Sequence, residues 1–407
     1  MKKILVNAYA VSPDKGSEPG MGWNWCVRLA ETYELYIITE GEFRDRIEAA
    51  LPALPQGRNM HFHYLPLSDR IRRMCWNQGD WRFYWYYRKW QKRALALARD
   101  ICARERIDVI HQLNMVGFRE PGFLWKIPRI PYIWGPIGGM SRTPVAFFRD
   151  LPASVQVKLQ VKNVLNSLQM NTSPRVYKAV ARSSAVLCAT EDERAFLQKK
   201  FPDKPLFVIA ETGIDRTEIL SRTPFMDGRF HILWVGRFIP SKQLGLALRI
   251  LSRLPQLDIV LDVLGTGNEK ENAAFRALSD KLGVSDRVVW HGSVPQPEVI
   301  RWMRSCDLFL FTSVREVTST VITEAISAGL PIICFDTCGF GPIVDGRIGR
   351  KVPCNDPDEA ERDFAAVISH LVANPSELEA MSGGGREHLL HLTWAYKMQQ
   401  LKKIYEL

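Results

Sequence analysis

Two glutamates near the carboxy-terminal end of the sequence, Glu316 and Glu324, stand eight positions apart and could bind one ligand together. Residues 306–313 before them have the composition of a fully buried strand, and residues 325–328 alternate like a helix that Pro331 then ends. We therefore expect Glu316 in the loop between strand and helix, and Glu324 one or two turns inside the helix. In an open α/β sheet the ligand crevice lies outside the carboxyl ends of the strands, so both carboxylates should border it.

The chemistry that such a pair favours is recognition of a sugar nucleotide. A carboxylate accepts two hydrogen bonds, which suits the paired hydroxyls of a ribose. The free amides and the positive end of the helix near residues 319–321 suit a diphosphate. The pair alone is weak evidence, because Glu316 could cap a helix and Glu324 could lie on its solvated face. The setting of the pair therefore decides its interpretation.

The size and composition of the chain restrict the fold that positions these residues. A chain of 407 residues is long for one core, so we expect two domains of roughly 200 residues each. Its 46% hydrophobic and 24% charged residues describe an ordinary globular protein. No uninterrupted apolar run approaches the ~18 to 20 residues of a membrane-spanning helix. The apolar stretch within residues 1–10 is too short for a signal peptide and predicts a first strand.

Metal binding has little support in the sequence. The eight cysteines are scattered, and Cys334 and Cys338 form a CxxxC without a second cluster at zinc-ligand spacing. We interpret the cysteines as reduced cytosolic thiols, most of them buried. The Asp-x-Asp formed by Asp356 and Asp358 has the composition of a helix start. We therefore expect neither a metal nor a cofactor.

The order of apolar runs and glycine loops predicts an α/β protein with two parallel sheets. Residues 4–10, 15–22, 23–32 and 34–39 form a strand, a glycine-bearing loop, a helix and a second strand, which is a βαβ unit. The later strands of the first half are expected at 108–111, 131–135, 185–190 and 207–210. Those of the second half are expected at 231–237, 257–264, 288–292, 308–311 and 331–335. The predicted domains are residues 1–212 and 213–388, with a helix in 389–407 that packs back on the first domain.

Five features recur in order over about a hundred residues of the second half. They are Val235-Gly236-Arg237 with Lys242 five residues on, Gly265-Thr266-Gly267, His291-Gly292, the Glu316 and Glu324 pair, and Ala328-Gly329-Leu330-Pro331. Together they resemble the retaining glycosyltransferases of family 4, strongly from about residue 230 to 345 and more loosely before. The resemblance implies the GT-B architecture, in which two Rossmann-like parallel-sheet domains face a central cleft.

The resemblance also implies a donor site. Arg237 and Lys242 would hold the donor diphosphate, Glu324 would bind the ribose, and Glu316 would lie against the donor sugar. Fixed cations in a closed cleft stabilise the charge of a departing nucleoside diphosphate without a metal. Arg237 and Lys242 could instead be solvated loop cations, and the glycines could serve only to make a turn. The remaining residues expected at the donor are Gly265, Gly267, His291, Ser319 and Thr320.

In the first half, residues 108–112 resemble the family segment that brings a histidine to the cleft beside the donor sugar. His111 would there donate a hydrogen bond to a sugar hydroxyl or orient the acceptor, and a buried structural histidine is the alternative. A glycine-rich loop would approach the donor phosphates or the acceptor, although many βα turns need glycine for geometry alone. The residues of this loop are Gly16, Glu18, Gly20 and Gly22.

The sequence departs from the family pattern at three places. The family usually has a glycine-containing turn after the first acid, whereas this chain has residues 317–320, whose hydroxyls could cap the helix or contact phosphate. Gln243 stands where a glycine commonly follows the lysine. Leu113 stands where the more frequent motif has a second histidine. The first two differences bear on the identity of the donor more than on the class of reaction, and the third bears on the role of His111.

Positive charge is concentrated in residues 51–200, which contain 25 Lys and Arg against 10 Asp and Glu. Within them, residues 70–93 have eight cations, eight aromatic residues and one acid. Aromatic side chains next to Lys and Arg favour the headgroup region of an anionic leaflet, so we expect membrane contact, with residues 155–168 adding two lysines among apolar residues. The alternative is a helix packed into the first domain with solvated cations. The candidate contact residues are Arg72, Arg73, Trp76, Trp81, Trp85, Arg88, Lys89 and Trp90.

The expected function is transfer of a hexose, with retention, from a UDP- or GDP-sugar to a hydroxyl of a lipid-linked glycan in cell-surface polysaccharide biosynthesis. The expected location is the cytoplasm, at the inner face of the plasma membrane. Nucleic acid is not an expected partner, because no RNP or helix-turn-helix signature is present. A sugar-nucleotide epimerase of the same fold and a non-catalytic membrane-binding protein are the alternatives. The sequence leaves the sugar, the base, the linkage and the oligomeric state open.

Overall fold

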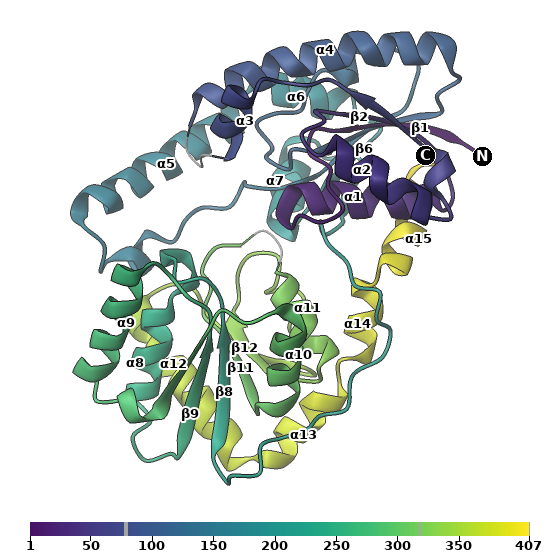
Figure 1. The fold of residues 1–407 in the computed structure, drawn as a ribbon. Coiled ribbons are helices and arrows are strands. Elements are labelled where there is room, and N and C mark those ends of the chain that lie inside the picture. Colours follow the sequence, from purple (N-terminus) through teal and green to yellow (C-terminus); the bar gives the residue numbers. More distant parts are fainter. Residues whose placement is uncertain (77–79, 317–318, 407) are drawn as a thin grey trace. The chain divides into compact units, whose positions relative to one another are not determined.

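The computed structural model describes residues 1–76, 80–316 and 319–406, and its chain divides into two compact units (Figure 1). The first unit comprises Met1–Ser141, Ser167–Thr212 and Lys397–Leu407. The second comprises Arg142–Asn166 and Gly213–Tyr396. Each unit contains a parallel β-sheet with helices, which confirms the predicted α/β class with two Rossmann-like domains.

The first sheet has, within the described residues, seven parallel strands in the order β3-β2-β1-β4-β5-β6-β7. The chain proceeds from β1 to β3 in one direction and from β4 to β7 in the other. The switch point of the sheet therefore lies between β1 and β4, where ligands of such sheets bind. The strands are β1 (Lys3–Ala8), β2 (Glu34–Thr39), β3 (Met60–Tyr64), β4 (Val109–Asn114), β5 (Tyr132–Ile137), β6 (Ala185–Cys188) and β7 (Leu206–Val208).

Helices cover both faces of the first sheet (Figure 1). On one face, α4, α6 and α7 pack into a single buried cluster with β1, β4, β5 and β6. On the other face lies α1 (Figure 1), whose side chain Trp25 is fully buried. The helices of this unit are α1 (Ser17–Ala30), α2 (Arg44–Ala50), α3 (Asp69–Trp76), α4 (Arg82–Arg104), α6 (Pro174–Arg182) and α7 (Glu191–Lys200), and α5 (Ala153–Thr172) and α15 (Trp394–Ile404) enter it from the second unit.

The predicted start of the first helix is wrong. We expected a glycine loop up to residue 22 and a helix from Trp23, but α1 begins at Ser17. Gly20 and Gly22 therefore lie inside the helix, against the backbone of the preceding loop. A Cβ atom on Gly20 would lie 2.1 Å from the Lys15 carbonyl oxygen, and one on Gly22 would lie 2.4 Å from that of Ala10. The glycines permit this close packing, which the periodicity of the sequence does not reveal.

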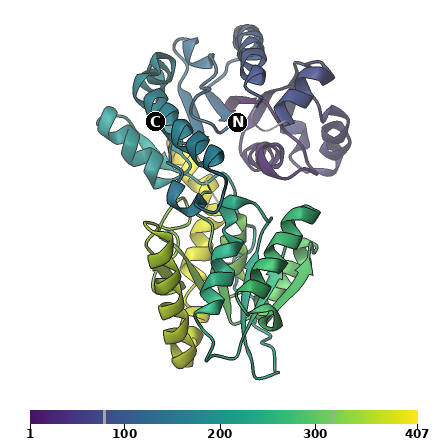
Figure 2. The ribbon, with the colours of Figure 1, turned by 90° about the vertical axis from the view of Figure 1, so that its left-hand side faces the viewer.

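The second sheet has the strand order β10-β9-β8-β11-β12-β13 and its switch point between β8 and β11. Helices α8, α9 and α12 cover one face and α10 and α11 the other (Figure 1), and α8 and α9 stand in front of the sheet in Figure 2. Strand β13 was not predicted, because two of its four residues are basic. The elements are β8 (Phe230–Val235), α8 (Leu244–Ser252), β9 (Ile259–Leu264), α9 (Glu269–Lys281), β10 (Val288–Gly292), α10 (Gln296–Ser305), β11 (Leu308–Phe311), α11 (Thr320–Ser327), β12 (Ile332–Phe335), β13 (Gly349–Val352), α12 (Pro357–Ala373), α13 (Pro375–Gly383) and α14 (Arg386–Leu392).

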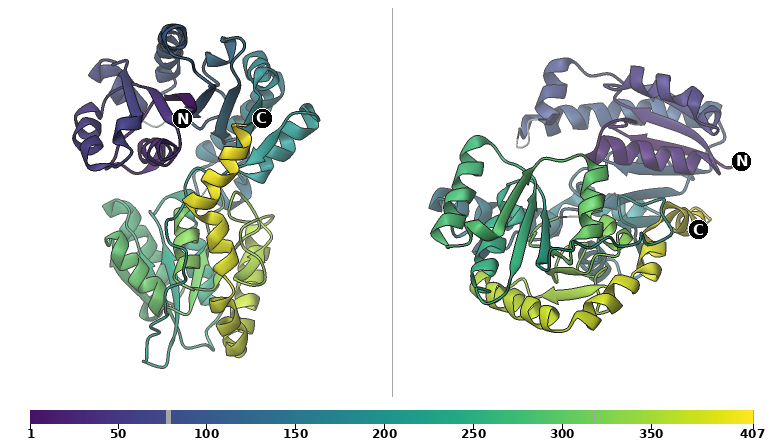
Figure 3. Two further views of the ribbon diagram at one scale, coloured as in Figure 1. Left: turned by 90° about the vertical axis from the view of Figure 1, so that its right-hand side faces the viewer. Right: turned by 60° about the horizontal axis from the view of Figure 1, so that its bottom comes forward.

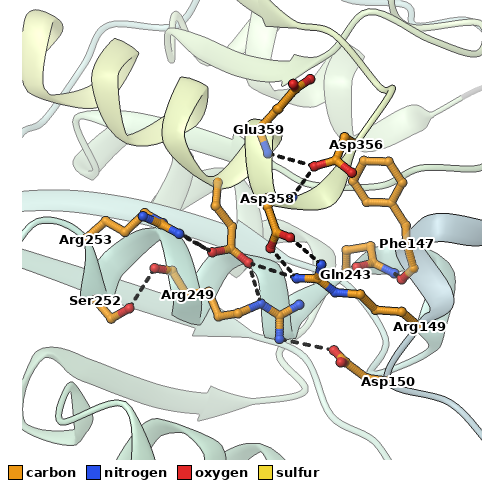
Figure 4. Close-up of polar contacts among 11 residues, drawn as sticks. Phe147, Arg149, Asp150, Gln243, Arg249, Ser252, Arg253, Asp356, Asp358 and Glu359 are labelled. Atoms are coloured by element: carbon orange, nitrogen blue, oxygen red, sulfur yellow. Dashed lines mark hydrogen bonds and ion pairs between the residues drawn. The ribbon is translucent and has the colours of Figure 1, made fainter.

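The two units differ from the predicted domains in two segments. Residues 142–166 belong to the second unit, and the return to the first unit begins at Lys397 rather than at residue 389, after α13 and α14, which lead to α15 in Figure 3. Ion pairs account for the first difference (Figure 4). Arg149 donates to both carboxylate oxygens of Asp358 on α12, and Asp150 lies 3.2 Å from the Arg249 guanidinium on α8.

No helix in the described part of the chain combines the length and the apolar composition needed to cross a bilayer.

Candidate functional site

The candidate donor site lies at the switch point of the second sheet. Arg237 lies two residues after the end of β8, and Glu316 lies in the loop after β11, which is the neighbouring strand. The carboxyl ends of these two strands therefore bring together residues that are 79 positions apart in the sequence. This placement agrees with the expected position of Glu316 in the loop between strand and helix.

Lys242 is positioned by a short turn that β11 fixes from the side. The turn, Pro240–Lys242, is a single 3-10 segment, and Gln243 after it has the left-handed backbone angle φ +55°. The Thr312 hydroxyl donates to the carbonyl oxygen of Lys242 at 2.8 Å. A left-handed angle favours glycine, which is the residue that the resemblance implies at the position of Gln243. Here the Gln243 amide compensates by donating to the carbonyl oxygen of Phe147 at 2.6 Å (Figure 4).

Lys242 and Glu316 form an ion pair through Nζ and Oε1. Their side chains are only 13% and 18% exposed, so water screens the pair weakly. The second carboxylate oxygen, Oε2 of Glu316, is buried and has no hydrogen-bond partner within the described residues. An unsatisfied buried acceptor is costly, and it calls for a donor such as a ligand hydroxyl. The two residues that were expected to bind the diphosphate and the sugar therefore lie in contact.

The Glu316 backbone is also held in place. Its amide donates to the sulfur of Cys338 at 3.3 Å. Cys338 is buried and has a positive φ of 58°. Its sulfur contacts the loop after β11 at Glu316. Sequence reasoning missed this residue, because it interpreted Cys338 as an ordinary buried thiol.

The glycines of the site pack three strand ends tightly together. Gly265 has φ +150°, and a Cβ atom there would lie 1.8 Å from the Gly236 carbonyl oxygen. Its amide donates to the Gly292 carbonyl oxygen at 2.7 Å. Gly267 lies against the Glu271 carboxylate, which would be 2.5 Å from a Cβ atom. Geometry thus accounts for both glycines, whereas direct contact with a nucleotide stays a prediction.

Arg237 and His291 lie beside these glycines and differ in whether their side chains already have hydrogen-bond partners. Arg237 is exposed, and within the described residues its guanidinium forms neither an ion pair nor a hydrogen bond. His291 Nε2 lies 2.8 Å from Asp262 Oδ1, and its ring centroid lies 4.0 Å from that of Trp302. Arg237 is therefore available to a ligand, while one nitrogen of His291 is already engaged.

Asp262 joins His291 to a second histidine. Its other oxygen, Oδ2, lies 2.7 Å from Nδ1 of His231, and Asp227 lies 3.0 Å from Nε2 of the same ring. Burial works to lower the pKa of His231, but the hydrogen bonds to Asp262 and Asp227 outweigh it, and the pKa is raised. Asp262 was not predicted, because it lies in the middle of a buried strand and its partners are about 30 residues away.

The start of α11 supplies the remaining donor residues. Ser319 is the N-cap residue and its side chain makes no capping hydrogen bond, while Thr320 is exposed. Glu324 lies in the second turn, as expected, and accepts a hydrogen bond from Gln296 at 2.9 Å. Burial raises the pKa of Glu324, and this hydrogen bond opposes the rise. Residues 317 and 318, which belong to the unusual turn, lie outside the described residues.

The predicted catalytic role of His111 is wrong. His111 is fully buried within β4, where Nδ1 lies 2.6 Å from the Tyr405 hydroxyl and Nε2 lies 2.7 Å from the Gly135 carbonyl oxygen. Burial lowers its pKa to about 4, so the ring is neutral at pH 7. Nε2 then donates to the carbonyl, Nδ1 accepts from the hydroxyl, and neither nitrogen is free for a substrate. His111 is the structural histidine that the sequence left as an alternative.

Glu18 is held at the carboxyl end of the first sheet. Its Oε1 accepts a hydrogen bond from the Val116 amide at 2.8 Å, and burial raises its pKa against the effect of that hydrogen bond. Gly16 stands before α1 with open space at its Cα. Of the loop residues expected to approach a ligand, Glu18 and Gly16 are therefore free of the packing that occupies the other two glycines.

The basic aromatic segment has an inner and an outer side. Trp90 is fully buried and donates from Nε1 to the Leu65 carbonyl oxygen, so it is wrong as a membrane contact. Arg72 pairs with Glu40 and Arg88 pairs with Glu120. The outer side keeps Arg73, Trp76, Trp81, Trp85 and Lys89, of which Trp81 is 77% exposed.

Residues 215–388 match the family model of glycosyl transferases group 1. A D-inositol 3-phosphate glycosyltransferase of Thermobispora bispora is 29% identical over 184 residues, which are 43% of this chain and 42% of that protein. The chain thus aligns with less than half the length of this curated relative. Sucrose-phosphate synthase from Thermosynechococcus elongatus has a similar fold, with a TM-score of 0.64, 14% identity, and coverage of 100% of this chain and 98% of that one. The structure of HepE from Anabaena, in complex with UDP, is also similar. Its TM-score is 0.62, its sequence identity is 15%, and the match covers 99% of this chain and 99% of that one. These similarities confirm the predicted GT-B type of fold.

Proposed function

We propose that the protein transfers a hexose from a nucleotide sugar to a hydroxyl group, with retention, because residues 215–388 match the family model of glycosyl transferases group 1. The observation that supports this most is the buried pair of Lys242 and Glu316 at the switch point, with Oε2 of Glu316 left without a donor. A sugar hydroxyl is the donor that this oxygen requires. UDP is the preferred candidate for the nucleotide, because the similar HepE structure contains UDP, and GDP is the second.

The proposed donor lies along the carboxyl ends of β8 and β11. Its diphosphate is held by Arg237 and Lys242 and by the free amides at the start of α11, next to Ser319 and Thr320. Glu324 binds the ribose and exchanges its hydrogen bond from Gln296 for the ribose hydroxyls. Glu316 accepts a hydrogen bond from a hydroxyl of the sugar through Oε2.

The proposed mechanism is front-face substitution without a metal. The bond between the anomeric carbon and the diphosphate oxygen breaks while the bond to the acceptor oxygen forms on the same face. The acceptor proton passes to the departing diphosphate oxygen, so no protein base is needed. Arg237 and Lys242 stabilise the charge that develops on this oxygen. The epimerase alternative loses support, because it needs acid and base groups around the sugar and His111 is buried with both nitrogens engaged.

A donor panel and a single variant test this proposal. UDP- and GDP-hexoses should raise the melting temperature, because a ligand that binds only the folded state stabilises it, and ADP-sugars serve for comparison. Glu316→Gln should lower kcat/KM about 100-fold, because the amide presents an acceptor and a donor where only acceptors are wanted. Exposed Glu218, in the same unit, provides the control Glu218→Gln with unchanged kinetics. Near wild-type turnover of Glu316→Gln would contradict the site, and product from donor alone would favour an epimerase.

We also propose a lipid-linked glycan of the cell surface as acceptor, and a peripheral position on the cytoplasmic face of the membrane. The support is the outer side of the basic aromatic segment, where Lys89 Nζ lies 3.4 Å from the centroid of the Trp85 ring. Exposed tryptophans and cations on α3 and on the first turns of α4 suit the headgroup region of an anionic leaflet.

Vesicle flotation tests the membrane contact. Replacing Arg73 and Lys89 with alanine should weaken binding to anionic vesicles about 30-fold, because each cation near the surface contributes about 1 kcal/mol. Replacing Lys270 and Lys281, two exposed cations of the second unit, removes the same charge and should leave flotation unchanged. If both double variants lost vesicle binding equally, the loss would reflect net charge alone and would contradict the assignment of the membrane contact.

A further inference from the structure

The first unit contains a pocket that the donor site does not use. It has a volume of about 190 Å³ and lies at the carboxyl ends of β1, β2 and β4. These strands flank the switch point of the first sheet, where open α/β sheets bind ligands. We call it the switch-point pocket. Its residues with polar or ionisable side chains are Tyr9, Ser17, Glu18, Thr39, Glu40, Glu42, Cys75 and Trp76.

The acids of the switch-point pocket are in two different states. Glu40 is only 2% exposed, and its carboxylate accepts hydrogen bonds from Arg72 and from the amides of Leu67 and Glu42. It is therefore neutralised and closed to a ligand. Glu18 has one amide partner, and both oxygens of Glu42 accept from Nε1 of Trp76 at 3.0 Å. No cation is among the residues that line the pocket, within the described part of the chain.

A pocket with these groups accepts hydrogen bonds and rejects anions. A carboxylate has about four lone-pair positions, so Glu18 and Glu42 each keep acceptor capacity after the hydrogen bonds described. Hydroxyl and ammonium groups can donate to them, whereas a phosphate or carboxylate would face two acidic side chains and no cation among the described lining residues. Glu42 is exposed, and partial burial of its carboxyl raises its pKa against the hydrogen bond from Trp76.

The pocket also has an apolar wall. The Trp76 ring is 49% exposed, and it is fixed by Glu42 and by edge-on contact with Phe43 at 6.2 Å between centroids. An exposed ring with its polar edge already satisfied presents a flat apolar face at low conformational cost. The faces of a pyranose ring that carry C–H groups match such a surface, while its hydroxyls match the carboxylates.

We propose that the switch-point pocket binds the acceptor as a neutral or amino sugar residue, and that Glu42 and Trp76 determine this specificity. The inference rests on the proposed transferase function and adds the chemical class of the acceptor to it. An acceptor whose reacting residue carries a phosphate or a carboxylate is excluded by the same side chains.

Acceptor kinetics and direct binding test the inference. Transfer should be faster to a methyl hexoside or a methyl hexosaminide than to a hexose 6-phosphate. Glu42→Gln and Trp76→Phe should raise the acceptor KM at least tenfold, and Glu42→Arg should shift preference toward the phosphate. Asp45→Asn, an exposed acid outside the pocket, should change none of these values. Thermal shift with the nucleotide sugar reports whether each variant is folded.

Quenching of Trp76 fluorescence measures binding of the same three compounds to the switch-point pocket without any turnover. The Trp76→Phe variant gives the background signal. Preference for the phosphate in the wild type, or unchanged acceptor KM values in both Glu42→Gln and Trp76→Phe, would overturn the inference. If no nucleotide sugar binds or reacts, the proposed function fails instead. Quenching by the two neutral or amino sugars would then still support the pocket, and its absence would refute it.

Discussion

Replacing Lys242 by alanine should lower kcat/KM for sugar transfer by about 100- to 1,000-fold, which is the usual effect of losing one group that stabilises charge in a transition state. Lys242 is fixed by the turn before α8 and by Thr312, so its ammonium is in place before the donor arrives. A flexible cation nearby cannot replace it without an entropic cost. Initial rates with the best donor of the thermal-shift panel measure the effect.

The same replacement should also destabilise the second unit, because it leaves Glu316 as a mostly buried carboxylate without its cation. Removing one partner of a buried pair costs about 3 kcal/mol or more. Adding Glu316→Gln removes the stranded charge and should recover most of the stability but none of the activity. Denaturant unfolding separates the two effects. Recovery of activity in the double variant would show that Lys242 only compensates Glu316 and takes no part in transfer.

The sequence predicted those parts of the site whose position depends on residues nearby in the chain. A parallel strand is a continuous apolar run, and the residue that follows it must lie at the carboxyl end of the sheet. Glu316 and Glu324 were found in this way, whereas Arg237 and Lys242 were implied by the resemblance of the ordered motifs to a known family. The same rule, applied to the strand that ends at Thr39, would have found Glu42 in the switch-point pocket.

The missed parts depend on distant partners. The local sequence around His111 cannot reveal that Tyr405, 294 residues later, occupies its ring nitrogen. Residues 142–166 were assigned to the wrong unit, because the ion pair of Arg149 joins positions 209 residues apart. Trp90 is different, since a helical signal was available. The aromatic residues Phe83, Tyr87 and Trp90 are spaced by four and then three positions, which is the spacing of one helix face. This spacing predicts the buried face of α4 and places Trp85 on the exposed face.

Gly265→Ala should destabilise the second unit by at least about 3 kcal/mol, enough to leave much of the protein without a folded donor site at 37 °C. At φ +150° a side chain is already strained, and the new Cβ atom would lie 1.8 Å from the Gly236 carbonyl oxygen. That oxygen cannot move away easily, because the Gly236 amide donates a hydrogen bond to the Leu264 carbonyl oxygen and so restrains the backbone. Denaturant unfolding measures the loss, and the thermal shift by nucleotide sugar should disappear with it.

Gly283→Ala provides the matched control for this prediction. Gly283, at the end of α9, also has a positive φ, of 67°, but a Cβ atom there would meet no other atom within 4 Å among the described residues. Its replacement tests backbone strain alone and should cost about 1 kcal/mol. The difference between the two variants therefore measures the close approach of the two loops together with the less common backbone angle of Gly265. Equal losses would mean that the strand ends are less tightly packed than their glycines indicate, and that Arg237 is not held rigidly beside the donor.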